Sequence, residues 1–270
     1  MRDQQTEIAR YLTTGKSDPI FSAWRGDILE RCTRGTAALH DELFREIQQR
    51  TRGMPLPSGL PAGDLARFAR SRVEPMVAGL FRAREREPVL LVLATSVVFV
   101  TPENVEALLR GESFLSTAWD VANLYLASRG APLLGPDEPP IVGFSTERRC
   151  YVSFGYFEEK SPLADFIVHE TAHIFHNCKR GTLGLPRTRR REWLLDIDFS
   201  KRETFAYACE ALSRLLALGR NRSERARLLD EHEASLPGDE RVDLDEYLDI
   251  LREAIATRNG WKRILARCAA

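Results

Sequence analysis

The order of apolar and polar residues divides the chain into a helical first part and a mixed second part. Up to about residue 86 the pattern is typical of helices, interrupted by Pro- and Gly-containing stretches at residues 53–55 and 57–63. Two short apolar runs rich in β-branched residues follow, at residues 89–93 and 97–100. These runs predict two strands that are buried on both faces.

Helical and strand patterns alternate along the rest of the chain. Thr101 and Pro102 predict a helix N-terminus, with Thr as the cap and Pro at the first helical position. A loop rich in Pro and Gly is expected at residues 130–140. Strands are expected at residues 141–145 and 149–157. Helices are expected at residues 102–110, 116–128, 161–177, 201–217, 223–233 and 244–257.

These elements together predict an α+β fold that is mainly helical. A small mixed or antiparallel sheet is expected to pack on the helix at residues 161–177 and on the following helix, which carries a Glu. Three regions are expected along the chain. They are an N-terminal helical region (residues 1–86), a core (residues 87–219) and a C-terminal helical region packed on the core (residues 220–270).

Composition narrows the classes of partner. Among 270 residues, 43% are hydrophobic and 29% charged, which is typical of a globular protein, and 39 basic residues balance 39 acidic ones. The chain therefore has no net charge that would attract nucleic acid or an anionic membrane. The longest apolar run, residues 88–100, is too short to span a membrane. Without a secretory signal or a C-x-x-C pair, the five scattered cysteines predict reduced thiols in a cytoplasmic protein.

One short motif carries chemistry. The run His169-Glu170-Thr171-Ala172-His173 is an H-E-x-x-H motif, which chance alone would produce about 0.008 times in a chain of this composition. On a helix, both imidazoles lie on one face and can share a metal ion. Zinc is commonly held by three protein ligands, which leaves one position for water, and Glu170 can accept that water's proton. The alternative is two core histidines satisfied by hydrogen bonds.

His169, Glu170 and His173 resemble the zinc signature of the zincin metallopeptidases, with the uncharged residues that the family's pattern asks for between and after them. The resemblance implies a zinc cofactor and the hydrolysis of peptide bonds in a protein or peptide substrate. It also implies an antiparallel strand ahead of the motif helix that lines the cleft, and residues 149–157 stand where that strand would be.

The third ligand separates the zincin subclasses. The metzincin pattern requires a Gly and a further His after the motif, and neither falls at the required position. The gluzincin type takes a Glu from a following helix, and Glu203 is the favoured candidate. The other candidates are Glu210, Asp196, Asp198 and His176. About 10.5 Å along the helix axis separates His176 from His169, too far to share one zinc ion, so His176 is expected at the cleft wall or facing solvent.

A polar stripe accompanies Glu203 on the predicted helix at residues 201–217. Tyr207, Glu210 and Arg214 follow it at helical spacing. In the functional interpretation, Tyr207 lies near the oxyanion that forms during hydrolysis, and Glu210 forms a hydrogen bond with a metal ligand without binding the metal itself. In the other interpretation the stripe is a solvated face with a Glu210–Arg214 ion pair.

Three functions remain open on these grounds. The first is a zinc metallopeptidase with Glu170 as general base. The second is a zinc amidase resembling the deformylases, with Cys150 as a ligand. The third is a regulatory binding module whose zincin-like core is not catalytic. A di-iron carboxylate site is excluded, because no second Glu-x-x-His occurs. The basic stretch at residues 179–191 is expected to be a solvated loop, or to contact an acidic substrate.

Overall fold

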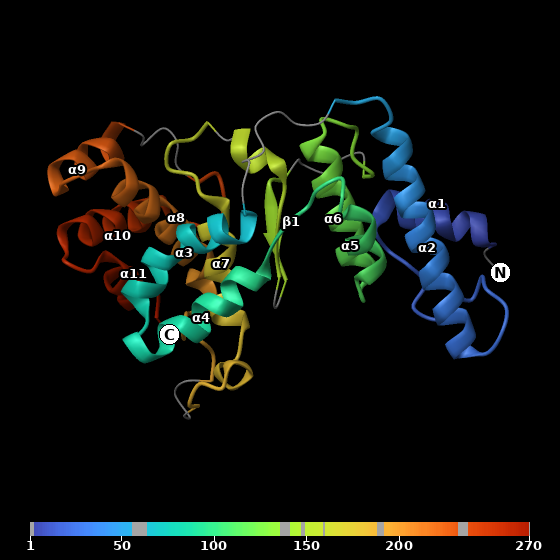
Figure 1. Ribbon diagram of the computed structural model, residues 1–270, viewed down its shortest axis with the longest axis horizontal. Helices are drawn as coiled ribbons and strands as arrows, with labels where there is room; N and C mark the ends of the chain where they lie inside the picture. Colours follow the sequence, from blue (N-terminus) through green and yellow to red (C-terminus); the bar gives the residue numbers. More distant parts are fainter. Residues whose placement is uncertain are drawn as a thin grey trace. The chain divides into compact units, whose positions relative to one another are not determined.

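The fold is mainly helical with one small sheet, as the computed structural model shows (Figure 1). The protein is 65% helical, and its three short strands form a mixed sheet, so the predicted α+β class is confirmed. No helix in the described part of the chain has the length and apolar character needed to cross a membrane. The structure describes residues 3–55, 64–135, 141–146, 149–158, 160–187, 192–231 and 237–269.

The helices and strands of the described residues have the following bounds. The α-helices are α1 (Gln4–Thr14), α2 (Ile28–Arg50), α3 (Leu65–Leu80), α4 (Ala83–Ser96), α5 (Val105–Gly111), α6 (Leu115–Ser128), α7 (Phe166–Asn177), α8 (Arg202–Leu218), α9 (Arg222–Glu231), α10 (Leu244–Ala256) and α11 (Gly260–Cys268). The strands are β1 (Val97–Phe99), β2 (Gly143–Ser145) and β3 (Cys150–Val152). Short 3-10 helices are η1 (Phe154–Glu158), η2 (Arg180–Leu183) and η3 (Phe199–Lys201).

The chain forms two compact units, and each is assembled from separated segments. The first unit comprises Met1–Leu60, Phe99–Val142 and Ser153–Phe157. The second comprises Pro61–Val98, Gly143–Val152 and Glu158–Ala270. The sequence had predicted three consecutive regions instead. The difference arises because α3 and α4 contact α7, whereas α5 and α6 contact α2.

The first unit is a helical group built on the apolar face of α2. Leu39, Leu43 and Ile47 recur at helical spacing on α2 and are buried, and this helix packs against α5 and α6. Two hydrogen bonds attach α1 to α6. The Tyr11 hydroxyl donates to the Leu115 carbonyl at 2.7 Å, and Trp119 Nε1 donates to the Leu12 carbonyl at 3.0 Å.

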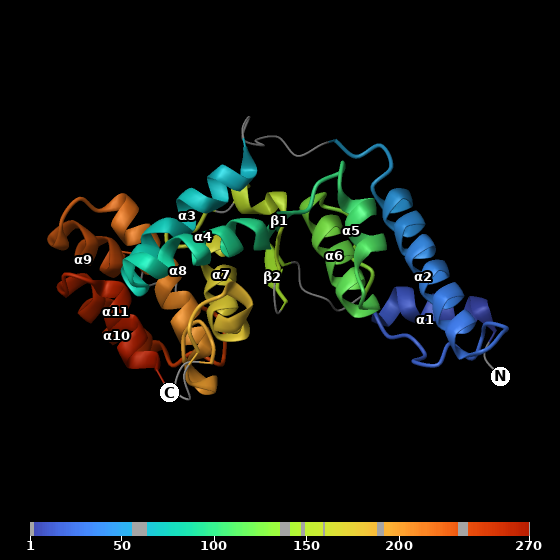
Figure 2. The same ribbon diagram turned by 60° about the horizontal axis from the view of Figure 1, so that its bottom comes forward.

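The second unit is organised around α7. The strand order of the sheet is β1-β3-β2, and β2 pairs with β3 in antiparallel register, with Phe144 opposite Tyr151. Helix α7 packs against β2, β3 and α8, as predicted, and Phe175 and Phe205 are fully buried between the elements of this core. Helices α10 and α11 lie against α8 (Figure 2).

The start of α7 is set by a buried cap. Asp165 accepts a hydrogen bond from the Val168 amide, and its carboxylate also receives the Arg72 guanidinium from α3. The helix therefore begins at Phe166, several residues later than the predicted start at Ser161. This cap fixes the position of the motif helix relative to α3.

Residues 89–93 were predicted as a strand, and this prediction is wrong. They belong to α4, where Val89, Leu90 and Leu93 are buried on one face while Leu91 is 60% exposed. A short apolar run fits either element, and burial against the rest of the second unit favours the helix here. The following strand, predicted at residues 97–100, is confirmed as β1, but Val97 and Val98 are half-buried, so the predicted burial on both faces is wrong.

Two boundaries and one element also differ from the predictions. Helix α5 begins at Val105, later than the start predicted at Thr101 and Pro102. Residues 101–104 form a turn in which the Asn104 side chain accepts a hydrogen bond from the Thr101 amide. The strand expected over residues 149–157 ends at Val152 and continues into η1. Helix α11 was not predicted.

Candidate metal centre

Three ligand atoms from α7 and α8 converge on one point. His169 Nε2 and His173 Nε2 are 3.2 Å apart, and Glu203 Oε2 lies 3.8 Å from the first and 3.5 Å from the second. In a tetrahedral site with bonds of about 2.0–2.1 Å, neighbouring ligand atoms are separated by about 3.3–3.4 Å. The observed spacing therefore fits a tetrahedral ion, and a pair of imidazoles with one carboxylate is a donor set that zinc accepts.

Glu210 contacts His169 through the ring nitrogen that is not part of the ligand cluster. His169 Nδ1 lies 3.1 Å from Glu210 Oε2, and the other oxygen of this carboxylate accepts from the Asp165 amide at 2.6 Å. A proton on Nδ1 that is donated to Glu210 leaves the lone pair of Nε2 directed at the cluster. Glu210 is thus not one of the three converging ligands, and it is buried rather than part of a solvated face.

Arg241 forms an ion pair with Glu203 and is itself paired with Asp239. Arg241 Nη1 lies 2.7 Å from Glu203 Oε1, the oxygen that faces away from the histidines, and Arg241 Nη2 lies 2.5 Å from Asp239 Oδ2. Glu203 therefore presents Oε2 alone to the cluster. Local sequence patterns contain no signal for either residue, because both lie in the loop before α10, far along the chain from Glu203.

Glu170 lies beside the edge of the sheet. Its side chain is buried, and it forms a hydrogen bond with the Ser145 side chain on β2. Burial raises the pKa of Glu170 above its usual value, although His169 and His173 act in the opposite direction. Gly143 permits the close approach of β2 to β3, because a Cβ there would lie 2.9 Å from the Tyr151 carbonyl oxygen.

Tyr207 lies against the first histidine. The ring centroids of Tyr207 and His169 are 4.4 Å apart in an edge-to-face arrangement. Burial, followed by the charges of Asp239, Glu210 and Glu203, raises the pKa of Tyr207 to about 12. Its phenol consequently keeps its proton at neutral pH and can donate a hydrogen bond.

The remaining candidate ligands lie apart from the cluster. His176 is buried with its ring 5.3 Å from that of His173, so the expectation that it faces solvent is wrong. Asp198 instead caps η3 by accepting from the Ser200 amide. Asp196 is exposed beside a different cavity. None of the three belongs to the metal-ligand cluster found among the described residues.

Two further predictions concern Cys150 and the basic stretch. Cys150 is buried in β3, where burial raises the pKa of its thiol, and it too is outside the cluster of described ligands. Arg180 is not solvated, because it forms a buried ion pair with Glu85. The prediction of a solvated loop is therefore wrong at this residue. Residues 188–191 lie outside the described part of the chain.

Comparison of the chain with protein-family models, with curated proteins and with solved structures gives no match. The resemblance to zincins therefore rests on His169, Glu170 and His173 and on the geometry around them.

Proposed function

We propose that the protein is a zinc-dependent metallopeptidase in which His169, His173 and Glu203 hold the ion. The observation that carries this proposal is the convergence of their three ligand atoms, at separations of 3.2–3.8 Å. The supporting carboxylate of Glu210 strengthens it, since a His ligand commonly donates its second N–H to a carboxylate.

The residues around the cluster divide the chemistry between them. Zinc, when bound, supplies Lewis acidity that polarises a carbonyl group and makes water a stronger acid. Glu170 accepts a proton from the attacking water and returns it to the leaving amine. The Tyr207 hydroxyl donates a hydrogen bond to the oxygen on which negative charge develops.

A peptide substrate suits the edge of the sheet next to Glu170. In the strand order β1-β3-β2, β2 has one side without a neighbouring strand among the described residues. An extended peptide can add to such an edge through main-chain hydrogen bonds. This assigns the substrate edge to β2, whereas the resemblance pointed to residues 149–157, whose strand β3 lies in the middle of the sheet.

The proposal is tested with Glu170→Gln, assayed on an unstructured protein and on short blocked peptides. We expect zinc to be retained and turnover to fall by about 10²–10⁴-fold, because only the proton acceptor is removed. Glu74→Gln is the matched control, since Glu74 is exposed on α3 of the same unit. Undiminished turnover in Glu170→Gln would contradict the mechanism. Turnover of simple amides or formylated peptides alone by the zinc-loaded protein would replace the peptidase with the amidase class.

A further inference from the structure

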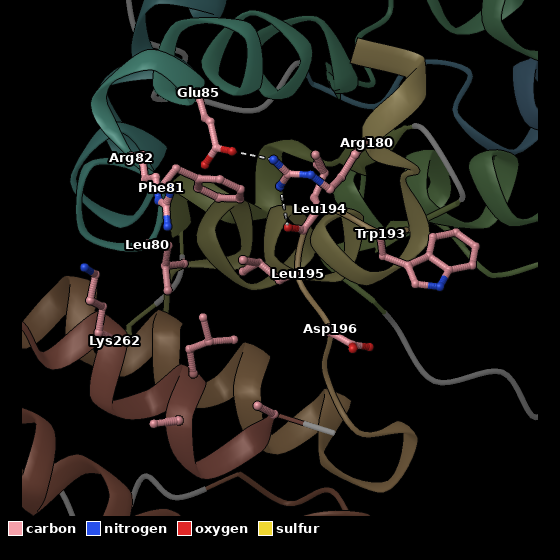
Figure 3. Close-up of a pocket in the computed structure, with 13 residues that line it drawn as sticks. Leu80, Phe81, Arg82, Glu85, Arg180, Trp193, Leu194, Leu195, Asp196 and Lys262 are labelled. Atoms are coloured by element: carbon pink, nitrogen blue, oxygen red, sulfur yellow. Dashed lines mark hydrogen bonds and ion pairs between the residues drawn. The ribbon is translucent and has the colours of Figure 1, made fainter. Parts of the chain in front are cut away.

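A second concave site lies in the second unit, apart from the metal cluster. It is a cavity of about 450 Å³ between the end of α3, the segment that precedes η3, and α11 (Figure 3). None of His169, His173 and Glu203 lines it. Its volume falls within the range of small-molecule sites, about 300–1,000 Å³. The residues around it determine which small molecules it can accept.

The floor of the cavity is apolar and held in place by the end of α7. Phe81, Leu194 and Leu195 line it and are buried. The Leu194 amide donates to the Cys178 carbonyl at 3.0 Å, the Leu195 amide donates to the Phe175 carbonyl at 2.9 Å, and the Phe81 ring packs against Phe175. These contacts are made between groups of the protein itself, so they hold the floor of the cavity in place.

The buried charges in the wall are already satisfied. Arg180 pairs with Glu85, its Nε donates to the Pro186 carbonyl at 2.9 Å, and its Nη1 donates to the Leu194 carbonyl at 3.4 Å. The donors of this guanidinium are thus directed at protein groups. Arg180 therefore contributes to the wall and is not the binding group for a ligand charge.

Two other cations at the rim have no such partner. Arg82, at the N-cap of α4, and Lys262, on α11, both line the cavity and are exposed. Neither side chain has a hydrogen bond or an ion pair with another described residue. Figure 3 shows them on one side of the cavity and Asp196 on the opposite side. Two cations face the single carboxylate of Asp196, so the rim carries a net positive charge next to an apolar floor.

We propose that this cavity binds a small carboxylate with an aliphatic body of medium length. The carboxylate lies between Arg82 and Lys262, and the aliphatic body covers Leu80, Leu195 and Leu265. The two cations complement the charge of the head, and the leucines bury the body away from water. This binding does not depend on zinc or on hydrolysis, so it stands or falls separately from the proposed function.

The test is calorimetric titration of the full chain with decanoate, compared with decanol as the uncharged analogue. Decanoate is expected to bind and decanol to bind more weakly. Arg82→Ala and Lys262→Ala are each expected to weaken decanoate binding by about threefold to fivefold, as for partly exposed ion pairs. Arg84→Ala is the matched control, because Arg84 is exposed on α4 and does not line the cavity.

A second variant tests the apolar part of the site. Ala266 is exposed on α11 at the cavity wall, and Ala266→Phe fills the space without changing the charge. It is expected to abolish decanoate binding while the melting temperature stays near that of the native protein. The proposal is overturned if decanoate does not bind, if decanol binds as tightly, or if the Arg82→Ala Lys262→Ala double variant and Ala266→Phe both bind decanoate normally.

Discussion

Two groups of charged and polar residues in the second unit, one buried and one partly buried, are built in opposite ways. In the Glu85–Arg180 pair, two opposite charges are in contact, and their side chains are 7% and 4% exposed. In the α7–α8 cluster, His169, His173 and Glu203 direct lone pairs at a common point, while Arg241 binds the outer oxygen of Glu203. The first group is complete within the chain, whereas we propose that the second is completed by a cation from solution.

This difference separates structural stability from metal binding. A buried ion pair is costly to break, because removal of one partner leaves the other charge buried without compensation. A site made of converging lone pairs gains its free energy only when the metal binds, so its contribution depends on metal concentration. Variants in the two groups should consequently respond differently to zinc.

The largest expected change in stability follows from Arg180→Ala. We expect the free energy of unfolding to fall by about 3–5 kcal/mol, because Glu85 loses its buried partner. Denaturant titration with and without zinc measures this loss, which should be the same in both. The control is the double variant Arg180→Met Glu85→Leu, which should recover much of the stability. A loss below about 1 kcal/mol would show that the pair behaves like an exposed one.

The next effect is the stabilisation of the native protein by zinc. At a free zinc concentration about 100 times the dissociation constant, the free energy of unfolding should rise by about 2.7 kcal/mol, provided that zinc does not bind the unfolded chain. Thermal unfolding with zinc and with a chelator measures the rise. His173→Ala should not show it, and Arg180→Ala should. Equal stabilisation of His173→Ala and the native chain would place the binding elsewhere.

Glu210→Ala tests the support of the first histidine. We expect zinc affinity to fall by about 10–100-fold, because His169 Nδ1 loses its acceptor. Competition with a chromogenic chelator gives the affinity. Glu210→Gln, which keeps an oxygen acceptor, should lose less, and Glu231→Ala on the exposed helix α9 should lose nothing. If Glu210→Ala binds zinc as tightly as the native chain, the His169–Glu210 contact has no role in metal binding.

The smallest effect belongs to Arg241. Its side chain is 67% exposed, so its pair with Glu203 is partly screened by solvent. Arg241→Ala should weaken zinc binding by no more than about fivefold, as for an exposed ion pair. The same chelator competition measures it, with the exposed Arg227→Ala as control. A loss as large as that of Glu210→Ala would show that Arg241 is essential for the orientation of Glu203.

The parts of the site that could be predicted are those set by helical periodicity. His169 and His173 share a face because they are one turn apart on a single helix, and Glu203 and Glu210 lie two turns apart on the next. Arg241 and Asp239 could not be predicted, because their loop reaches Glu203 only through the packing of α10 against α8.

The fold shows the same limit. Helix α8, which has a long apolar stripe, was predicted with nearly correct bounds, whereas the helices of the first 86 residues were predicted only as a helical region. The run at residues 89–93 was assigned to the wrong element, because five apolar residues contain too little periodicity to separate a helix from a buried strand. The grouping into two units depends on contacts between distant segments, which local patterns do not encode.

The most direct test of the zinc site is the metal content of the purified native chain and of three variants, measured by elemental analysis. We predict about one zinc per chain in the native protein and in Glu170→Gln, because three ligands are intact in both. Zinc should be strongly reduced in His173→Ala and Glu203→Ala. Full zinc content in Glu203→Ala would contradict the ligand set, and a native chain that takes up no zinc would contradict the proposed function itself.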